Sequence, residues 1–230
     1  MKLNRQQNPS LQQISNLRLP KMEVLKLDNH IPAWMINTGS QELLKLQFSF
    51  PAGSIYQNKA LVSFFTLQML LEGSQNYSAA QTAERLDFLG AFINTRSSKD
   101  FAYLEVFCLN KHLKEVLEIV KDILTQALFP VKELNVLKQQ HKQAHIIDIG
   151  KVQTQARRSF NQEIFGAQNT YGRLASLSDF EKLKAEDLRL FYQKQFAPSN
   201  WSLFVSGKIG PKEVASIQEY IGSIPLVNRS

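Results

Sequence analysis

The sequence lacks the features that mark disulfide-stapled, membrane-spanning or nucleic-acid-binding chains. A single cysteine, Cys108, stands among 230 residues, so no disulfide can form within the chain. The most apolar window, residues 61–71, is interrupted by polar side chains and is far shorter than the ~18–20 residues that span a bilayer. The charge of +7 is spread along the chain, without the runs of about five Lys or Arg that mark a nucleic-acid patch. We therefore expect no membrane span and no nucleic-acid partner.

What is present is an ordinary globular composition, with 43% hydrophobic and 20% charged residues. A chain of this length buries roughly 70% of its unfolded surface and needs no metal or disulfide to fold. The apolar neighbours of Cys108 predict a buried thiol rather than a nucleophile. The N-terminus shows no signal peptide, which favours a cytoplasmic location. A periplasmic location is the alternative if a leader peptide was removed.

The pattern along the chain predicts one α+β domain. Residues 1–21 are polar and irregular and are expected to form an extension, residues 22–222 the domain, and residues 223–230 the start of a linker to a missing second domain. Period-two alternation predicts a strand over 44–50, and an apolar run predicts another over 201–205. Because strands and helices come in mixed order, we expect a mostly antiparallel sheet with helices packed on one face.

Helical spacing of apolar residues predicts helices over 58–72 and 111–128, and a mostly helical stretch over 131–165 that breaks at Gly150. Ser78 and Gln81 form a capping-box pattern that opens a further helix ending near Leu89. Between these helices, residues 91–109 have the pattern of a hairpin that turns around residues 96–99.

From about Met22 to Ile209 the chain resembles the N-terminal domain of the pitrilysin/insulinase family of zinc metallopeptidases. The order and spacing of several short segments carry the resemblance. They are Leu27-Asp28-Asn29, Phe50-Pro51-Ala52-Gly53-Ser54, Leu71-Glu72-Gly73-Ser74, Leu89-Gly90-Ala91-Phe92-Ile93-Asn94, and residues 187–207 with Phe191-Tyr192 and Val205-Ser206-Gly207.

The resemblance implies a His-x-x-Glu-His helix, in which two His bind zinc and the Glu is the general base, and a third ligand, a Glu, on a later helix. In this chain Phe64 stands at the first His, Leu67 at the Glu, Gln68 at the second His and Ala144 at the third ligand. Residues 55–80 contain no His, so a small shift of register restores nothing. We expect a non-catalytic homologue without a cofactor of its own, with zinc only in an active partner.

Two histidines on the later helix leave two interpretations open. His141 and His145 have the i, i+4 spacing of a metal-chelating pair, with Asp148 next on that face. The alternative is a solvated polar face, because Gln and Lys residues surround them. A run of basic residues near these histidines also has two interpretations. It forms either a solvated face or an inner wall that attracts acidic peptide or a partner subunit. The residues are Lys138, Lys142, Lys151, Arg157 and Arg158.

Apolar residues at the lost zinc positions also allow two interpretations. The side chains of Phe64, Phe65, Leu67 and Leu71 form either a plain core stripe or an apolar pocket in place of the metal. A pocket would leave this helix with a surface that can bind a ligand, whereas a core stripe would not.

The family resemblance implies that an edge strand pairs with extended peptide by strand addition. In this chain that strand is Ala91, Phe92, Ile93, Asn94 and Thr95. Main-chain hydrogen bonds would survive loss of the zinc ligands. The resemblance implies a heterodimer in which this domain completes the chamber of a zinc-bearing homologue. A purely structural subunit, or a divergent metallohydrolase with a relocated site, are the alternatives.

Overall fold

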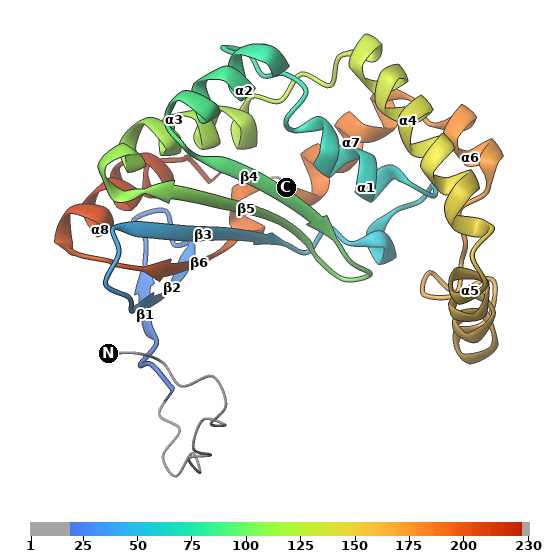
Figure 1. The fold of residues 1–230 in the computed structure, drawn as a ribbon, viewed down its shortest axis with the longest axis horizontal. Coiled ribbons are helices and arrows are strands. Elements are labelled where there is room, and N and C mark those ends of the chain that lie inside the picture. Colours follow the sequence, from blue (N-terminus) through green and yellow to red (C-terminus); the bar gives the residue numbers. More distant parts are fainter. Residues whose placement is uncertain (1–18, 227–230) are drawn as a thin grey trace, which may run out of the picture.

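A single mixed sheet forms the centre of the computed structural model, which describes residues 19–226 (Figure 1). Its strand order is β1-β2-β6-β3-β5-β4, and only the β2–β6 pair is parallel. The strands are β1 (Glu23–Lys26), β2 (Pro32–Asn37), β3 (Leu43–Phe50), β4 (Phe92–Ser97), β5 (Ala102–Leu109) and β6 (Ser202–Gly207). The predicted α+β class is confirmed. The expected extension lies almost wholly outside the described residues, as do residues 227–230 of the expected linker.

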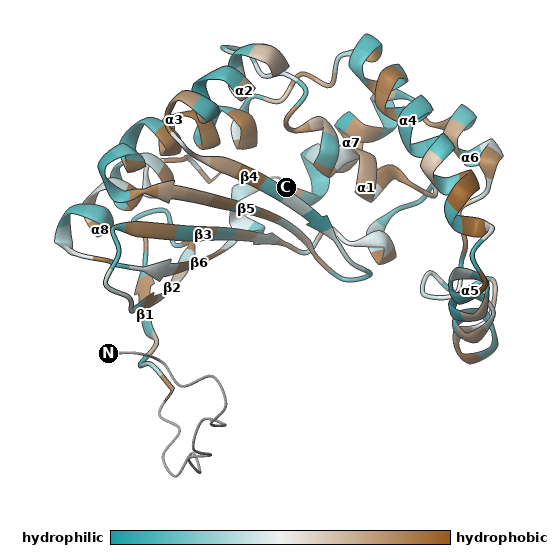
Figure 2. Ribbon diagram, in the orientation of Figure 1, coloured by the Kyte–Doolittle hydropathy of each residue, from teal (hydrophilic) through white to brown (hydrophobic). Residues whose placement is uncertain are grey.

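Alternation along the strands places one face of the sheet against the helices. In β3, the side chains of Leu44, Leu46 and Phe48 are fully buried, whereas the residues between them lie on the open face. The buried face continues through alternate residues of β5 and β6. Figure 2 shows the hydrophobic colouring concentrated on these strands and on the helices that cover them. Cys108 belongs to this core, and burial raises the pKa of its thiol to about 12, which confirms the predicted inert thiol.

The helices cover one face of the sheet and extend beyond its β4 edge (Figure 1). They are α1 (Val62–Met69), α2 (Ala79–Phe88), α3 (Leu113–Thr125), α4 (Val131–Ile149), α5 (Val152–Phe165), α6 (Leu177–Lys182), α7 (Ala185–Gln195) and α8 (Pro211–Ile217), with short turns η1 (Ser54–Tyr56), η2 (Asn110–His112) and η3 (Pro198–Asn200) and a π-helical turn η4 (Gln218–Gly222). Among residues 19–226, none of these helices has the length and apolar character needed to cross a bilayer.

Local sequence signals predicted some helix ends and missed others. The capping box of Ser78 and Gln81 is present and opens α2 as expected. The helix expected from residue 58 begins at Val62, because Leu61 has the left-handed backbone angle φ of 72° and cannot continue a right-handed helix. Past the domain end expected at residue 222, Ile224 is only 2% exposed, and its carbonyl accepts a hydrogen bond from the side chain of Asn29.

A close backbone contact fixes the hairpin of β4 and β5 to the segment before α1. A Cβ atom at Gly53 would lie 2.2 Å from the carbonyl oxygen of Lys99, so only glycine fits there. The Gly53 N–H donates to the carbonyl of Asp100 at 3.0 Å. The segment Phe50–Ser54 therefore positions the hairpin relative to α1.

A buried carboxylate fixes the segment after α1 to α3. Asp122 is 6% exposed, and it accepts hydrogen bonds from the Ser74 hydroxyl and from the Asn76 amide, the latter at 2.6 Å. Both donors lie in the connection between α1 and α2. Buried polar groups that lose their partners destabilise the fold strongly.

We predict that Asp122→Ala lowers the free energy of unfolding by about 3 kcal/mol, because it leaves two donors without their acceptor in the interior. Urea denaturation followed by circular dichroism measures the change. Glu118→Ala, on the exposed face of the same helix, is the matched control and should change stability by less than about 0.5 kcal/mol. Equal effects of the two substitutions would show that the Asp122 hydrogen bonds do not stabilise this connection.

Candidate functional site

Helix α1 carries three of the four positions that the family resemblance is expected to align with a zinc site. Leu67 is fully buried in the core, as is its neighbour Phe65. Phe64 and Gln68 are half-buried and lie on the other side of α1. Phe64 also lines a pocket. The helix therefore combines the two interpretations that the sequence left open, with a core stripe on one side and a pocket wall on the other.

Helix α4 faces α1 through a histidine. The His141 ring lies edge-on to Phe64, with ring centroids 4.8 Å apart, and to Phe65 at 5.5 Å. Burial lowers the pKa of His141, so the neutral ring is favoured in this apolar contact. One turn further on, the ring of His145 lies 5.5 Å from that of Phe180. These half-buried rings thus pack against phenylalanines that the rest of the fold supplies and that the local sequence could not predict.

The residues at the positions that the resemblance implies for zinc and its base do not suit those roles. The side chain of Phe64 has no lone pair to donate to a metal, Gln68 offers only a neutral amide, and Leu67 cannot act as a general base. Ala144 is exposed on α4, where the contact with Phe64 is made by His141 instead. Among the described residues, no group of three or more His, Cys, Asp or Glu side chains could hold a metal ion.

Most of the basic residues of α4 and α5 have partners within the fold. Lys142 pairs with Glu181 at 2.8 Å, and Lys151 pairs with Asp148 at 3.1 Å. The side chains of Lys138 and Arg158 donate to the backbone carbonyls of Leu183, at 3.0 Å, and Ala175, at 3.5 Å. The contacts of Lys138, Lys142 and Arg158 attach α4 and α5 to later segments, whereas the Lys151–Asp148 pair is local to the junction between the two helices.

Strand β4 forms one edge of the sheet. Its observed bounds correct the expected strand, because Ala91 precedes β4 and donates its N–H to Leu86, whereas the strand continues to Ser97. The Ser98 N–H donates to the Phe101 carbonyl at 2.8 Å, which marks this pair as hydrogen-bonded across the hairpin. Antiparallel pairing alternates, so Ile93, Thr95 and Ser97 direct their N–H and C=O groups away from β5. They form the unpaired edge of the described sheet.

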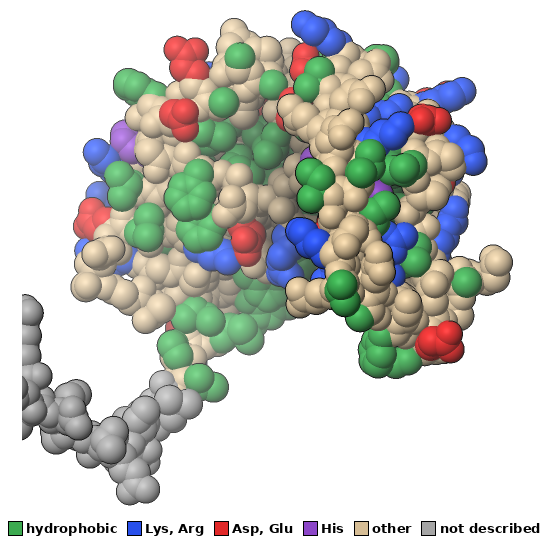
Figure 3. Space-filling view, turned by 45° about the vertical axis from the view of Figure 1, so that its right-hand side comes forward, with side chains coloured by type: hydrophobic (Ala, Val, Ile, Leu, Met, Phe, Trp, Pro, Cys, Tyr) green, Lys and Arg blue, Asp and Glu red, His purple; other side chains and the backbone are tan. Residues whose placement is uncertain are grey.

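The open face of the sheet carries aromatic pairs that the sequence did not predict. Trp34 stacks on Phe204, and Phe92 stacks on Phe107, with ring centroids 4.8 and 4.7 Å apart. The guanidinium of Arg96 lies 4.2 Å from the centre of the Tyr103 ring. The alternation of each strand places its aromatic residues on one face, but the pairing of aromatics from β2, β4, β5 and β6 depends on strand order. Figure 3 shows Lys and Arg side chains where the sheet meets the helical part.

Comparisons with known proteins agree with this architecture. A zinc protease of Bacillus subtilis (strain 168), YmxG, which is described as uncharacterized, is 23% identical over 172 residues, covering 70% of this chain and 40% of that protein. The crystal structure of a peptidase M16 inactive domain from Pseudomonas fluorescens superposes with a TM-score of 0.82 at 17% identity, over 91% of this chain and 53% of that one.

The periplasmic protease PqqL from Escherichia coli has a TM-score of 0.81 at 17% identity, over 91% of this chain and 24% of that one. The chain thus spans about half or less of the relatives it matches. The family model described as Insulinase (Peptidase family M16) matches residues 35–170, which is more than half of the sequence. The chain therefore belongs to the insulinase family of peptidases, M16.

Proposed function

We propose that this domain is a non-catalytic member of the family that completes the substrate chamber of a zinc-dependent endopeptidase and binds extended peptide. The aromatic contact at a position that the resemblance aligns with a zinc ligand supports this most directly. Phe64, which the resemblance aligns with the first zinc ligand, packs against His141 together with its neighbour Phe65. Without ligands or base, the domain has no means of activating a water molecule by the family mechanism.

The edge of β4 supports the peptide-binding part of the proposal. Strand addition uses backbone N–H and C=O groups, so it needs no metal and tolerates many side chains. Ile93, Thr95 and Ser97 present these groups in one row, and α1 lies beside the same strand. A bound peptide would extend the sheet by one antiparallel or parallel strand.

The partner in this proposal is a zinc-bearing homologue of the same family. The similar structures include the first half of PqqL, of which this chain covers 48%. A domain of this size can therefore occur as a part of a larger family member. In the complex that we propose, zinc and the general base belong to the partner, and this domain contributes a wall of the chamber and the peptide-binding edge.

We predict that Thr95→Pro weakens the binding of extended peptides by at least about tenfold, because proline removes an outward N–H while the pairs of β4 with β5 remain. Fluorescence anisotropy with labelled, unstructured peptides measures the affinity. Thr95→Ala removes the same side chain but retains the N–H, so it should bind peptide as the unaltered protein does.

Circular dichroism establishes that both variants fold. Peptide binding that survives Thr95→Pro would place the peptide elsewhere than β4. If no extended peptide binds the unaltered protein at micromolar concentrations, the domain has a purely structural role.

We also predict that co-expression with its zinc-bearing homologue yields a stable complex with higher peptidase activity than the homologue alone. Co-purification and cleavage of a quenched fluorescent peptide measure the two effects. Substituting the general base of the homologue should abolish cleavage in the complex. A failure to form the complex together with no gain in activity would contradict the proposed role, and cleavage that survives the substitution would indicate a relocated site in this domain.

A further inference from the structure

A pocket of about 160 Å³ lies between the start of α1, the end of β4 and the loop that joins α5 to α6. Leu61 and Phe64 of the α1 region form an apolar part of its wall. Ser97, the last residue of β4, contributes to the side nearest the sheet. Lys99 and Arg173 add two positive charges from the hairpin and from the loop.

Among the described residues, neither Lys99 nor Arg173 makes an ion pair with a carboxylate within 4.0 Å. Arg173 is, however, near enough to Asp179 for its charge, beside the hydrogen bonds from Ser176, to lower the pKa of that carboxyl. Lys99 donates from Nζ to the carbonyl of Tyr171 at 2.9 Å, and Arg173 donates to the carbonyl of Asn58 at 3.4 Å. Burial lowers the pKa of Lys99, which means that its charge is incompletely solvated and not offset by an anion.

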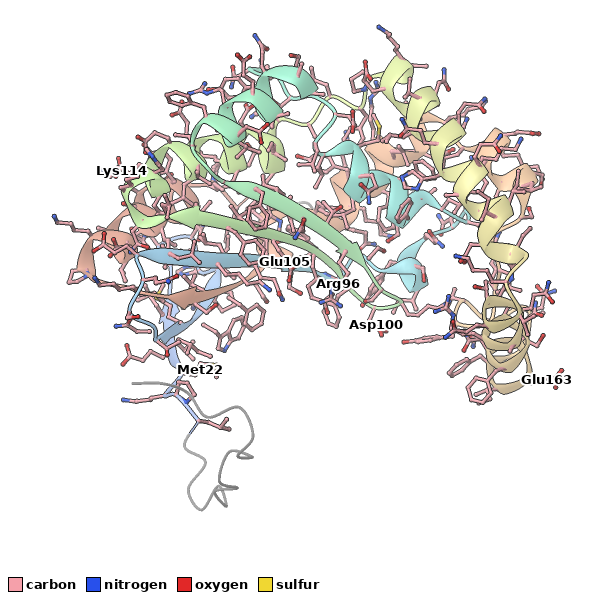
Figure 4. All side chains as sticks on the ribbon, in the orientation of Figure 1. Met22, Arg96, Asp100, Glu105, Lys114 and Glu163 are labelled. Atoms are coloured by element: carbon pink, nitrogen blue, oxygen red, sulfur yellow. The ribbon has the colours of Figure 1, made fainter. Side chains whose placement is uncertain are left out.

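The neighbouring carboxylates are engaged by other groups. Asp100 accepts a hydrogen bond from the Tyr171 hydroxyl, which joins the loop to the hairpin tip. Asp179 accepts from the backbone and the hydroxyl of Ser176, both at 2.8 Å, as part of the cap of α6. Figure 4 shows Arg96 and Asp100 near the hairpin tip, which points toward the α5 region. An anion that enters the pocket would thus meet two cations without first displacing an ion pair.

The pocket lies on the side of β4 that a paired peptide would reach. The Ser97 hydroxyl is 3.3 Å from that of Ser63 in α1, so its side chain is on the helix-covered face. A peptide residue opposite Ser97 would direct its side chain to that same face, because directly opposed residues share a face in a sheet. The pocket opens there, next to the unpaired backbone groups of Ser97.

We propose that this pocket binds a carboxylate of the extended peptide, held by Lys99 and Arg173. The inference rests on the proposed pairing of peptide with β4 and adds its chemical selectivity. A guanidinium and an ammonium donate charge-assisted hydrogen bonds to carboxylate oxygens. The apolar side formed by Leu61 and Phe64 suits the methylene groups of an acidic side chain. A C-terminal carboxylate supplies the same chemistry when the peptide ends at this point.

The test uses two sets of peptides built on one neutral, unstructured host sequence. In the first set the C-terminus is amidated, and each position in turn carries either Glu or Gln. In the second set the peptide carries Gln, and its C-terminus is either free or amidated. Affinities are measured by fluorescence anisotropy at low and high salt. We expect at least one carboxylate peptide to bind about tenfold more tightly than its neutral counterpart, with the ratio falling as salt screens the charges. The pair that responds identifies the source of the carboxylate.

Arg173→Gln and, separately, Lys99→Met should each bring this affinity ratio toward one. Lys111→Gln removes a positive charge from η2, outside the pocket, and should leave the ratio unchanged. A ratio near one at every position in the unaltered protein, with peptide binding retained, overturns the carboxylate pocket and leaves the peptide-binding proposal intact. A ratio that falls equally in Lys111→Gln overturns it as well, because the selectivity then reflects overall charge. Failure of all peptides to bind overturns both proposals.

Discussion

The contact between α1 and α4 rests on aromatic rings, and the arrangement of the site depends on it. Phe64 and Phe65 meet His141 edge-on, in a geometry that contributes about 0.5–1.5 kcal/mol per pair beyond the burial of apolar area. A zinc site would require charged or polar ligands to converge on the same place. In our proposal the apolar contact takes the place of that convergence, and it keeps the two helices in register. Since burial favours the neutral form of His141, its contribution to stability is present above the ordinary pKa of histidine and is lost as the pH falls through the lowered value.

The fold could be predicted to a useful extent from local signals. The alternation of β3 and the capping box of α2 are each encoded within a few residues, and both are present. The start of α1 could not be predicted in this way, because leucine seldom adopts the left-handed conformation that Leu61 has. The last residues of β4 were missed because Ser97 and its neighbours resemble turn residues, although pairing with β5 continues through them.

The contacts of the candidate site were harder to predict from the sequence, because they join segments that are far apart in the chain. His141 reaches Phe64 from another helix, so its neighbours in the sequence could not predict this aromatic contact. The pocket beside β4 brings together Lys99 and Arg173, which no spacing rule relates. The loss of zinc-binding and general-base chemistry at Phe64, Leu67 and Gln68 stays a prediction, because it depends on the register of the family resemblance as well as on residue type.

The zinc content of the purified chain tests the central claim most directly. Protein prepared without a chelator or a histidine tag is analysed for metal beside a zinc-bearing homologue treated in the same way. A domain whose metal position is filled by packed aromatic rings should hold less than about 0.1 equivalent of zinc, whereas the homologue should hold about one. About one equivalent in this chain would contradict the claim and would show that other residues, such as His141 and His145, form a metal site.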